Sequence, residues 1–197
     1  MQQEKEMSSQ ESLELITRMI TKTRTDYYNS GVSALLWGSV ITFCSLVTYA
    51  NFYLQWKGLG YVWFLTIAAV VPQIIIAIRE KKRSRVKTHD EDMMGGIWIS
   101  FGIAVFLFSY ILNVYPYSQA IPVFMVLYGV PTFATGYSRQ FRPMVIGGLA
   151  CWALAILSLF CSPPYTMLCM AAAAQLAWFI PGLILRKCYL QAKKRNV

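Results

Sequence analysis

Six long apolar stretches divide this chain, and its charged residues lie in the gaps between them. The stretches cover about 32–54, 61–78, 94–114, 119–138, 143–162 and 165–185. None of them contains Asp, Glu, Lys, Arg or His. Each is close to the roughly 20 residues that an α-helix needs to cross a hydrocarbon core of about 30 Å. The sequence therefore predicts an all-α fold, a polytopic membrane bundle of six transmembrane helices.

The overall composition agrees with a membrane protein. Hydrophobic residues make up 56% of the chain and charged residues 14%, whereas a soluble domain carries about 25% charged residues. The first thirty residues are polar and mixed in charge, without the basic and apolar regions of a secretory signal. We therefore expect no cleaved signal peptide, and the first span acts as the targeting signal.

The distribution of bases predicts how the helices cross the membrane. Of the 18 Lys and Arg residues, all except Lys57 lie in the N-terminal segment, in alternate connections or in the C-terminal tail. Basic residues near span ends are retained in the cytoplasm. We expect a multi-pass protein of the cytoplasmic (inner) membrane with both termini cytoplasmic. Topology also explains the net charge of +9, and no nucleic-acid partner is expected because no basic and aromatic platform for single strands is present.

The polar segment 1–30 is predicted to contain an amphipathic cytoplasmic helix. Leu13, Ile16 and Ile20 recur at helical spacing, and Ser8 is placed to cap the first turn. Such a helix lies on the membrane surface, covers the cytoplasmic end of the bundle or docks a partner. The predicted domains are this segment at 1–30, the six-helix domain at 31–186 and a basic cytoplasmic tail at 187–197.

The spans group into three hairpins that share several features. Each odd span carries small residues four apart, which let helix backbones approach closely in lipid. The predicted helix-packing residues are Ala34, Gly38, Gly96, Ser100, Gly147 and Cys151. Each even span carries a proline and each odd span a tryptophan, namely Pro72, Pro131, Pro181, Trp37, Trp98 and Trp152. These features predict an internal repeat, and the alternative is that Gly and Pro are simply common in membrane helices.

Three neutral polar side chains lie near the prolines and have two interpretations. They either line a cavity that serves as a pore or small-molecule site, or they bond to neighbouring helices, which is the commoner role. The candidate cavity or helix-kink residues are Pro72, Gln73, Pro131, Thr132, Gln175 and Pro181.

The sequence predicts no catalytic, metal or cofactor site. The spans lack the ionisable residues that usually mark proton relays and ion sites, and no base lies next to a Ser or Cys nucleophile. The five cysteines form no C-x-x-C motif and the chain has a single histidine, so a zinc site is not expected. Cys161 lies near the outer surface and is open to oxidation, but its own loop offers no partner.

Basic residues in one connection and in the tail are candidates for contacts outside the bundle. The candidates for contact with lipid headgroups or a partner protein are Lys81, Lys82, Arg83, Arg85, Lys193, Lys194 and Arg195. The leading hypothesis is a non-catalytic sensing, scaffolding or accessory role through the cytoplasmic face. The alternative is a transporter, channel or immunity-type protein that uses a cavity between the even helices. The sequence leaves a homo-oligomer open.

Several short motifs carry a resemblance to a known family. They are Leu36-Trp37-Gly38, the stretch Leu127-Tyr128-Gly129-Val130-Pro131, the run from Phe141-Arg142-Pro143 to Trp152, and Ile180-Pro181-Gly182. With these motifs the chain resembles an uncharacterised family of small six-helix membrane proteins found in Bacteroidota, often encoded beside a winged-helix regulator. The resemblance implies a role in envelope sensing or stress response, and it assigns no functional residue.

Overall fold

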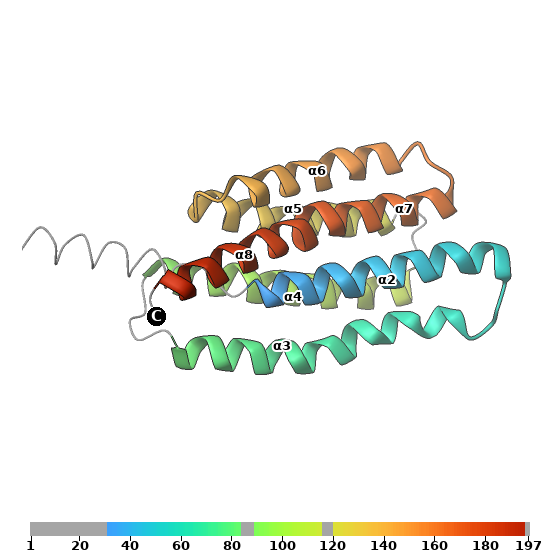
Figure 1. The fold of residues 1–197 in the computed structure, drawn as a ribbon. Helices are drawn as coiled ribbons and strands as arrows, with labels where there is room; N and C mark the ends of the chain where they lie inside the picture. Colours follow the sequence, from blue (N-terminus) through green and yellow to red (C-terminus); the bar gives the residue numbers. More distant parts are fainter. Residues whose placement is uncertain (1–30, 84–88, 116–119, 196–197) are drawn as a thin grey trace, which may run out of the picture.

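The computed structural model describes residues 31–83, 89–115 and 120–195, and these residues form an all-α bundle (Figure 1). The elements are α2 (Val32–Leu54), η1 (Leu59–Trp63), α3 (Phe64–Arg83), α4 (His89–Val114), α5 (Ala120–Ser138), α6 (Arg142–Ser158), α7 (Pro163–Ala174), η2 (Gln175–Phe179) and α8 (Ile180–Arg195). Here η1 is a 3-10 turn and η2 a π-helical segment. Because α7, η2 and α8 follow one another without a break, we call them the C-terminal rod.

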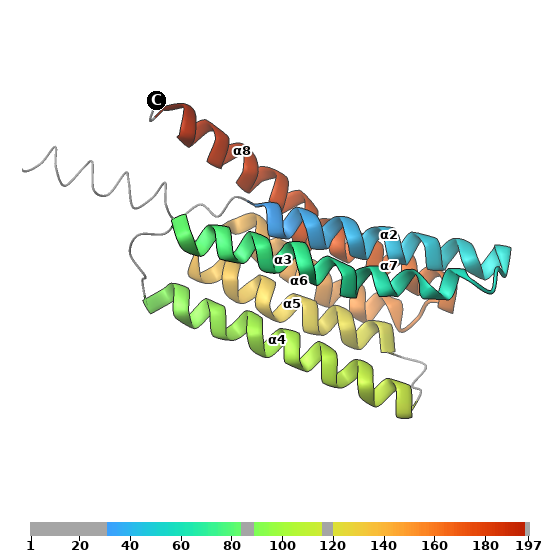
Figure 2. The ribbon, with the colours of Figure 1, turned by 90° about the horizontal axis from the view of Figure 1, so that it is seen from below.

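The C-terminal rod is the central element of the bundle. It packs against α2, α5 and α6, and α5 and α6 also form an extensive contact with each other. The two remaining helices lie at the edge, α3 against α2 and α4 against α5 (Figures 1 and 2). The predicted hairpin partners are therefore neighbours in space, since α2 contacts α3, α4 contacts α5 and α6 contacts α7.

The prediction of six membrane spans is supported for five helices. The helices that are long and apolar enough are Val32–Leu54, Leu59–Glu80, Met93–Val114, Ala120–Ser138 and Pro163–Gln191. The remaining helix, α6, is apolar but has only 17 residues, which corresponds to roughly 25 Å at 1.5 Å per residue. The predicted six-span fold is thus corrected to a bundle with five long candidate spans and one shorter apolar helix.

The end of the apolar stretch 143–162 explains why α6 is short. The amide of Leu159 bonds to the carbonyl of Ile156 at 3.2 Å, and the amide of Cys161 bonds to that of Ser158 at 3.2 Å. These bonds to the third preceding residue belong to a tight turn and not to an α-helix. Ser162 is then extended, with ψ of 156°, because a residue that precedes proline avoids the helical conformation. The predicted amphipathic helix in segment 1–30 lies outside the described residues.

Two glycines let neighbouring backbones approach the π-helical segment of the rod from opposite sides. A Cβ atom on Gly38 of α2 would lie 2.8 Å from the backbone nitrogen of Phe179. A Cβ atom on Gly147 of α6 would lie 2.5 Å from the carbonyl oxygen of Leu176. Both distances are shorter than a real Cβ contact, so only glycine fits while the backbones stay this close. This is the small-residue packing that is common between membrane helices.

The small residues of α4 have a different environment. A Cβ atom on Gly96 would meet no heavy atom within 4 Å. Ser100 is exposed and its hydroxyl bonds to the carbonyl of Ile97 in its own helix. The predicted small residues of α2 and α6 therefore face the rod, whereas those of α4 face away from the described helices.

We predict that Gly38→Ala and Gly147→Ala each destabilise the bundle, because the added methyl group must push two backbones apart. Overpacking of this kind costs about 1–3 kcal/mol. Gly96→Ala is the matched control, and it should be neutral or slightly stabilising because alanine favours a helix by about 1 kcal/mol over glycine. The measurement is thermal unfolding of the purified protein in detergent. Equal midpoints for Gly147→Ala and Gly96→Ala would contradict the close packing of the rod.

Candidate functional site

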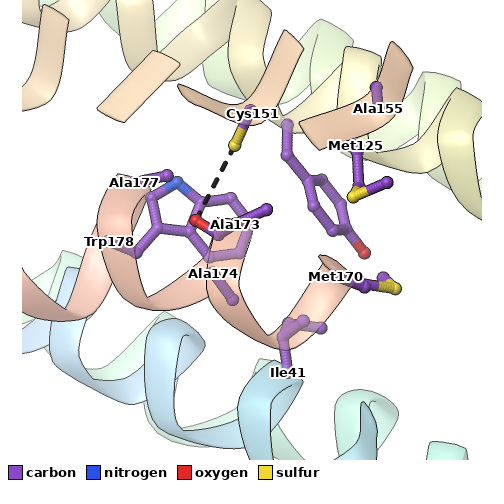
Figure 3. Close-up of a cluster of buried hydrophobic side chains, with 10 residues drawn as sticks. Ile41, Met125, Cys151, Ala155, Met170, Ala173, Ala174, Ala177 and Trp178 are labelled. Atoms are coloured by element: carbon purple, nitrogen blue, oxygen red, sulfur yellow. Dashed lines mark hydrogen bonds between the residues drawn. The ribbon is translucent and has the colours of Figure 1, made fainter. Parts of the chain in front are cut away.

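The buried core surrounds the middle of the C-terminal rod (Figure 3). The rod presents small side chains here, with Ala173 and Ala177 fully buried. The aromatic rings of Tyr128 from α5 and Trp178 from the rod fill the space beside them, with centroids 4.9 Å apart. The Cys151 thiol of α6 points to the carbonyl oxygen of Ala173 at 3.8 Å. The core is therefore filled by contacts between the rod and its neighbours.

Two of the candidate polar residues connect the rod to its neighbours by hydrogen bonds. The indole Nε1 of Trp178 donates to Oγ1 of Thr132 at 2.8 Å, and that hydroxyl donates to the carbonyl of Tyr128 at 2.7 Å. Gln175 donates from Nε2 to Oγ1 of Thr42 on α2 at 2.9 Å. Thr132 is completely buried. Because an unpaired polar group in hydrocarbon costs several kcal/mol, these bonds favour the assembled bundle.

The same arrangement of indole, threonine and carbonyl occurs at two further places. Trp98 of α4 donates to Thr135 at 3.1 Å, and the Thr135 hydroxyl donates to the carbonyl of Pro131 at 2.7 Å. Trp63 donates to Thr48 of α2 at 3.0 Å, and the Thr48 hydroxyl donates to the carbonyl of Cys44 at 2.8 Å. In each case the hydroxyl accepts from another segment and donates within its own helix, so both its proton and a lone pair are used.

The candidate Gln73 joins the edge helix α3 to α2. Its Oε1 accepts a hydrogen bond from Nε1 of Trp37 at 3.1 Å, and its Nε2 donates to Oγ of Ser33 at 3.2 Å. These two bonds use both the oxygen and the nitrogen of the Gln73 side-chain amide. Gln73, Thr132 and Gln175 are thus all engaged in bonds between helices, which is the second of the two interpretations given above.

The three prolines lie in different surroundings. Pro131 and Pro181 are almost fully buried in α5 and α8, whereas Pro72 is half-buried in α3 at the edge of the bundle. The π-helical segment ends at Phe179, two residues before Pro181, and the amide of Ile180 bonds to the carbonyl of Gln175. Proline cannot donate to the fourth preceding carbonyl, and a π-bulge is one way in which a helix accommodates this loss.

The predicted repeat is matched by the bonding of two hairpins but not of the third. Trp37 and Trp98 each donate to the even helix of their own hairpin. The third tryptophan, Trp152, donates to the carbonyl of Val126 on α5 at 3.2 Å, and so bonds to the preceding hairpin. The equivalence of all three units stays a prediction.

The candidates for headgroup contact lie mostly outside the described side chains. The side chain of Lys194 is exposed. The side chains of the other six are not among the described ones: Lys81, Lys82, Arg83, Arg85, Lys193 and Arg195. Described bases near them are Arg79 at the end of α3, Arg139 and Arg142 at the α5–α6 turn, and Arg186 and Lys187 in α8.

Within the described ranges, no group of three or more His, Cys, Asp or Glu side chains is placed to hold a metal ion. Two buried polar atoms there, Oγ of Ser45 and Oδ1 of Asn51, have no hydrogen-bond partner. The sequence did not identify four residues as hydrogen-bond acceptors, namely Ser33, Thr42, Thr48 and Thr135. Threonine and serine are frequent in membrane helices, so their positions alone do not reveal which ones bond to a neighbour.

The geometry defines a class of protein. Five long apolar helices, a packed core and hydrogen bonds between helices describe a polytopic α-helical membrane protein that associates with a lipid bilayer. Comparison with known proteins finds no matching family model, no matching curated protein and no matching solved structure. The resemblance to a Bacteroidota membrane family therefore stays a prediction from the motifs.

We predict that Thr132→Val destabilises the protein by about 1–2 kcal/mol, because it leaves the buried indole N–H of Trp178 without an acceptor. Thr132→Ser keeps the hydroxyl and is the matched control, with a smaller loss from the missing methyl group. The measurement is a double-mutant cycle with Trp178→Phe, in which the free energy of unfolding of each variant is determined in detergent. A coupling energy near zero between the two positions would show that this hydrogen bond contributes nothing.

Proposed function

We propose that this chain is a non-catalytic protein of the cytoplasmic (inner) membrane that acts through one charged end as a sensing, scaffolding or accessory component. The supporting observation is the separation of charge from the apolar interior. The described basic side chains other than Lys57 belong to the end of α3, the α5–α6 turn and α8, and these segments lie at the same end of the bundle (Figure 1). We call this the basic end.

The proposed orientation places the basic end and both termini in the cytoplasm. Positive charge near span ends favours the cytoplasmic side, and the opposite end carries aromatic side chains instead. Tyr49 and Tyr53 stack edge to face there at 5.4 Å between centroids, and Tyr165 lies 6.4 Å from Tyr49. Tyrosine at this level is typical of the membrane–water interface.

The basic end is proposed to contact anionic lipid headgroups or a cytoplasmic partner. Arg142, Arg186 and Lys187 are exposed, and each basic residue near a membrane surface contributes about 1 kcal/mol to attraction by anionic lipids. A function as a transporter or channel has less support, because Gln73, Thr132 and Gln175 are used in bonds between helices. The proposal therefore places the activity at the surface and not in the bundle interior.

Replacing Arg139 and Arg142 together by glutamine should weaken retention of anionic lipid roughly tenfold or more, given about 1 kcal/mol for each charge. Lys57→Gln is the control, because Lys57 is the base that the described residues place at the opposite end. The measurement is the amount of phosphatidylglycerol that stays with the purified protein, determined by native mass spectrometry against phosphatidylcholine. Equal losses for the double variant and for Lys57→Gln would overturn headgroup contact at the basic end.

The orientation has a separate test. In a background with serine at Cys161, Cys169 and Cys188, Lys57→Cys should react with a membrane-impermeant maleimide added to intact cells. Lys187→Cys should react only after the cells are opened, because the basic end faces the cytoplasm. The reverse pattern would contradict the proposed topology.

A further inference from the structure

Gly31, where the described part of the chain begins, lies against the backbone of α8. It is buried and has a φ of 70°. A Cβ atom there would lie 2.6 Å from the carbonyl oxygen of Gly182 and 3.0 Å from the backbone nitrogen of Arg186. The first distance is shorter than a real Cβ contact, and the positive φ also favours glycine. Segment 1–30 is therefore joined to the bundle directly beside α8, which belongs to the basic end.

One side of α8 is not covered by the other described helices. α8 packs against α2, α6 and η2, and its C-terminal part extends beyond the other labelled helices (Figure 2). Exposed side chains follow one another along it at intervals of four, three and four residues, namely Leu183, Lys187, Leu190 and Lys194. This spacing places them on one side of an α-helix. We call these four residues the α8 stripe.

The α8 stripe is both apolar and positively charged. Leu183 and Leu190 are each 48% exposed, and an exposed leucine stabilises a contact in which apolar side chains cover it. Residues 186–195 contain five bases and no acid, so this part of α8 attracts carboxylates. The stripe therefore fits a segment that carries apolar and acidic side chains together.

Segment 1–30 has this combination in its sequence. Leu13, Ile16 and Ile20 recur at helical spacing. Residues 1–14 contain four glutamates and one lysine, which gives a formal side-chain charge of −3. The other bases of the segment all follow Thr17. The acidic and apolar part of the segment is therefore complementary to the α8 stripe in charge and in polarity.

The segment is also long enough to reach the whole stripe. Residues 15–30 would span about 24 Å as an α-helix, at roughly 1.5 Å per residue. The distance along α8 from Arg186 to Lys194 is about 12 Å on the same basis. Attachment at Gly31 gives the segment an effective concentration on the order of millimolar at α8, which a separate partner would have to match.

We propose that residues 4–20 dock on the α8 stripe of the same chain. The apolar side chains of the segment cover Leu183 and Leu190, and its glutamates lie beside Lys187 and Lys194. The docked segment occupies the α8 part of the basic end and leaves the α5–α6 turn open to other contacts. Because the contact is within one chain, it does not depend on the proposed contact with anionic lipid.

Cysteine cross-linking tests the contact in the purified full-length protein, held in an uncharged detergent without added lipid. In the serine background of the maleimide test, Ile16→Cys is combined with Leu190→Cys. Mild oxidation by copper phenanthroline should form a bridge within one chain, detected by peptide mass spectrometry. The matched control combines Ile16→Cys with Arg142→Cys, an exposed position of the basic end that lies on α6. The bridge to Leu190→Cys should form about tenfold faster, because docking raises the local concentration of the two thiols.

A second measurement needs no added cysteine. Glu11→Gln combined with Glu14→Gln removes two charges of the segment, and mass spectrometry then follows acetylation of the lysines by an amine-reactive ester. Lys187 and Lys194 should react about threefold faster in the double variant than in the wild type, because surface charge pairs that cover them are lost. Lys57 at the opposite end is the internal control and should react at an unchanged rate.

Three results would overturn the docking. Equal rates of bridge formation to Leu190→Cys and Arg142→Cys would show that the segment has no preference for α8. A bridge that forms only between two chains would assign the α8 stripe to a second copy. Unchanged acetylation of Lys187 and Lys194 in the double variant would show that the glutamates do not cover them. None of these measurements involves lipid retention, so failure of the docking is distinguishable from failure of the proposed headgroup contact.

Discussion

The polar side chains of the C-terminal rod form hydrogen bonds to neighbouring helices, and these bonds hold the centre of the bundle together. Gln175 bonds to α2 and Trp178 bonds to α5, while Gly38 and Gly147 bring α2 and α6 against the segment between them. In a bilayer no water is present to satisfy a free amide or indole, so such groups must pair inside the protein. Two polar residues of the π-helical segment, together with two glycines on the helices beside it, therefore fix the positions of three neighbouring helices. Both polar residues belong to the π-helical segment Gln175–Phe179, which precedes Pro181.

The outer helices follow the same rule with fewer contacts. α3 is attached to α2 by the Trp37–Gln73–Ser33 bonds, and α4 is attached to α5 by the Trp98–Thr135 bond. Most of their other apolar side chains, such as Ile74 and Phe106, are exposed, as expected of surfaces that face lipid. Hydrogen bonds between polar side chains thus specify which helices pair, whereas the apolar side chains around these bonds do not specify a partner helix. None of the six apolar stretches contains a charged residue, and this is why we propose the basic end for any electrostatic role.

Sequence reasoning predicted much of the fold, because apolar length and charge follow directly from composition. Five of the predicted spans are long apolar helices, and the predicted hairpin partners are in contact. The predicted length of α6 was wrong, because the stretch 143–162 stays apolar beyond the point at which the helix ends in a tight turn.

Gln73 and Gln175 were predicted as polar residues in apolar spans that bond or line a cavity, but their hydrogen-bond partners Ser33 and Thr42 were not predicted. A hydroxyl is common in membrane helices, and its partner depends on rotation of two helices that periodicity does not supply. The bonds of Trp63 and Trp178 were not predicted, because both residues lie in even spans, outside the tryptophan pattern that the odd spans share.

We propose that the polar residues beside the prolines hold helices together and do not line a route for solutes. The most direct test is solute flux into lipid vesicles that contain the purified protein, with small ions, sugars and amino acids as probes. We expect the flux of each probe to equal that of protein-free vesicles, both for the wild type and for Gln175→Leu. Saturable flux through the wild-type protein that is lost in Gln175→Leu, with the variant still folded, would contradict it and would favour a transporter.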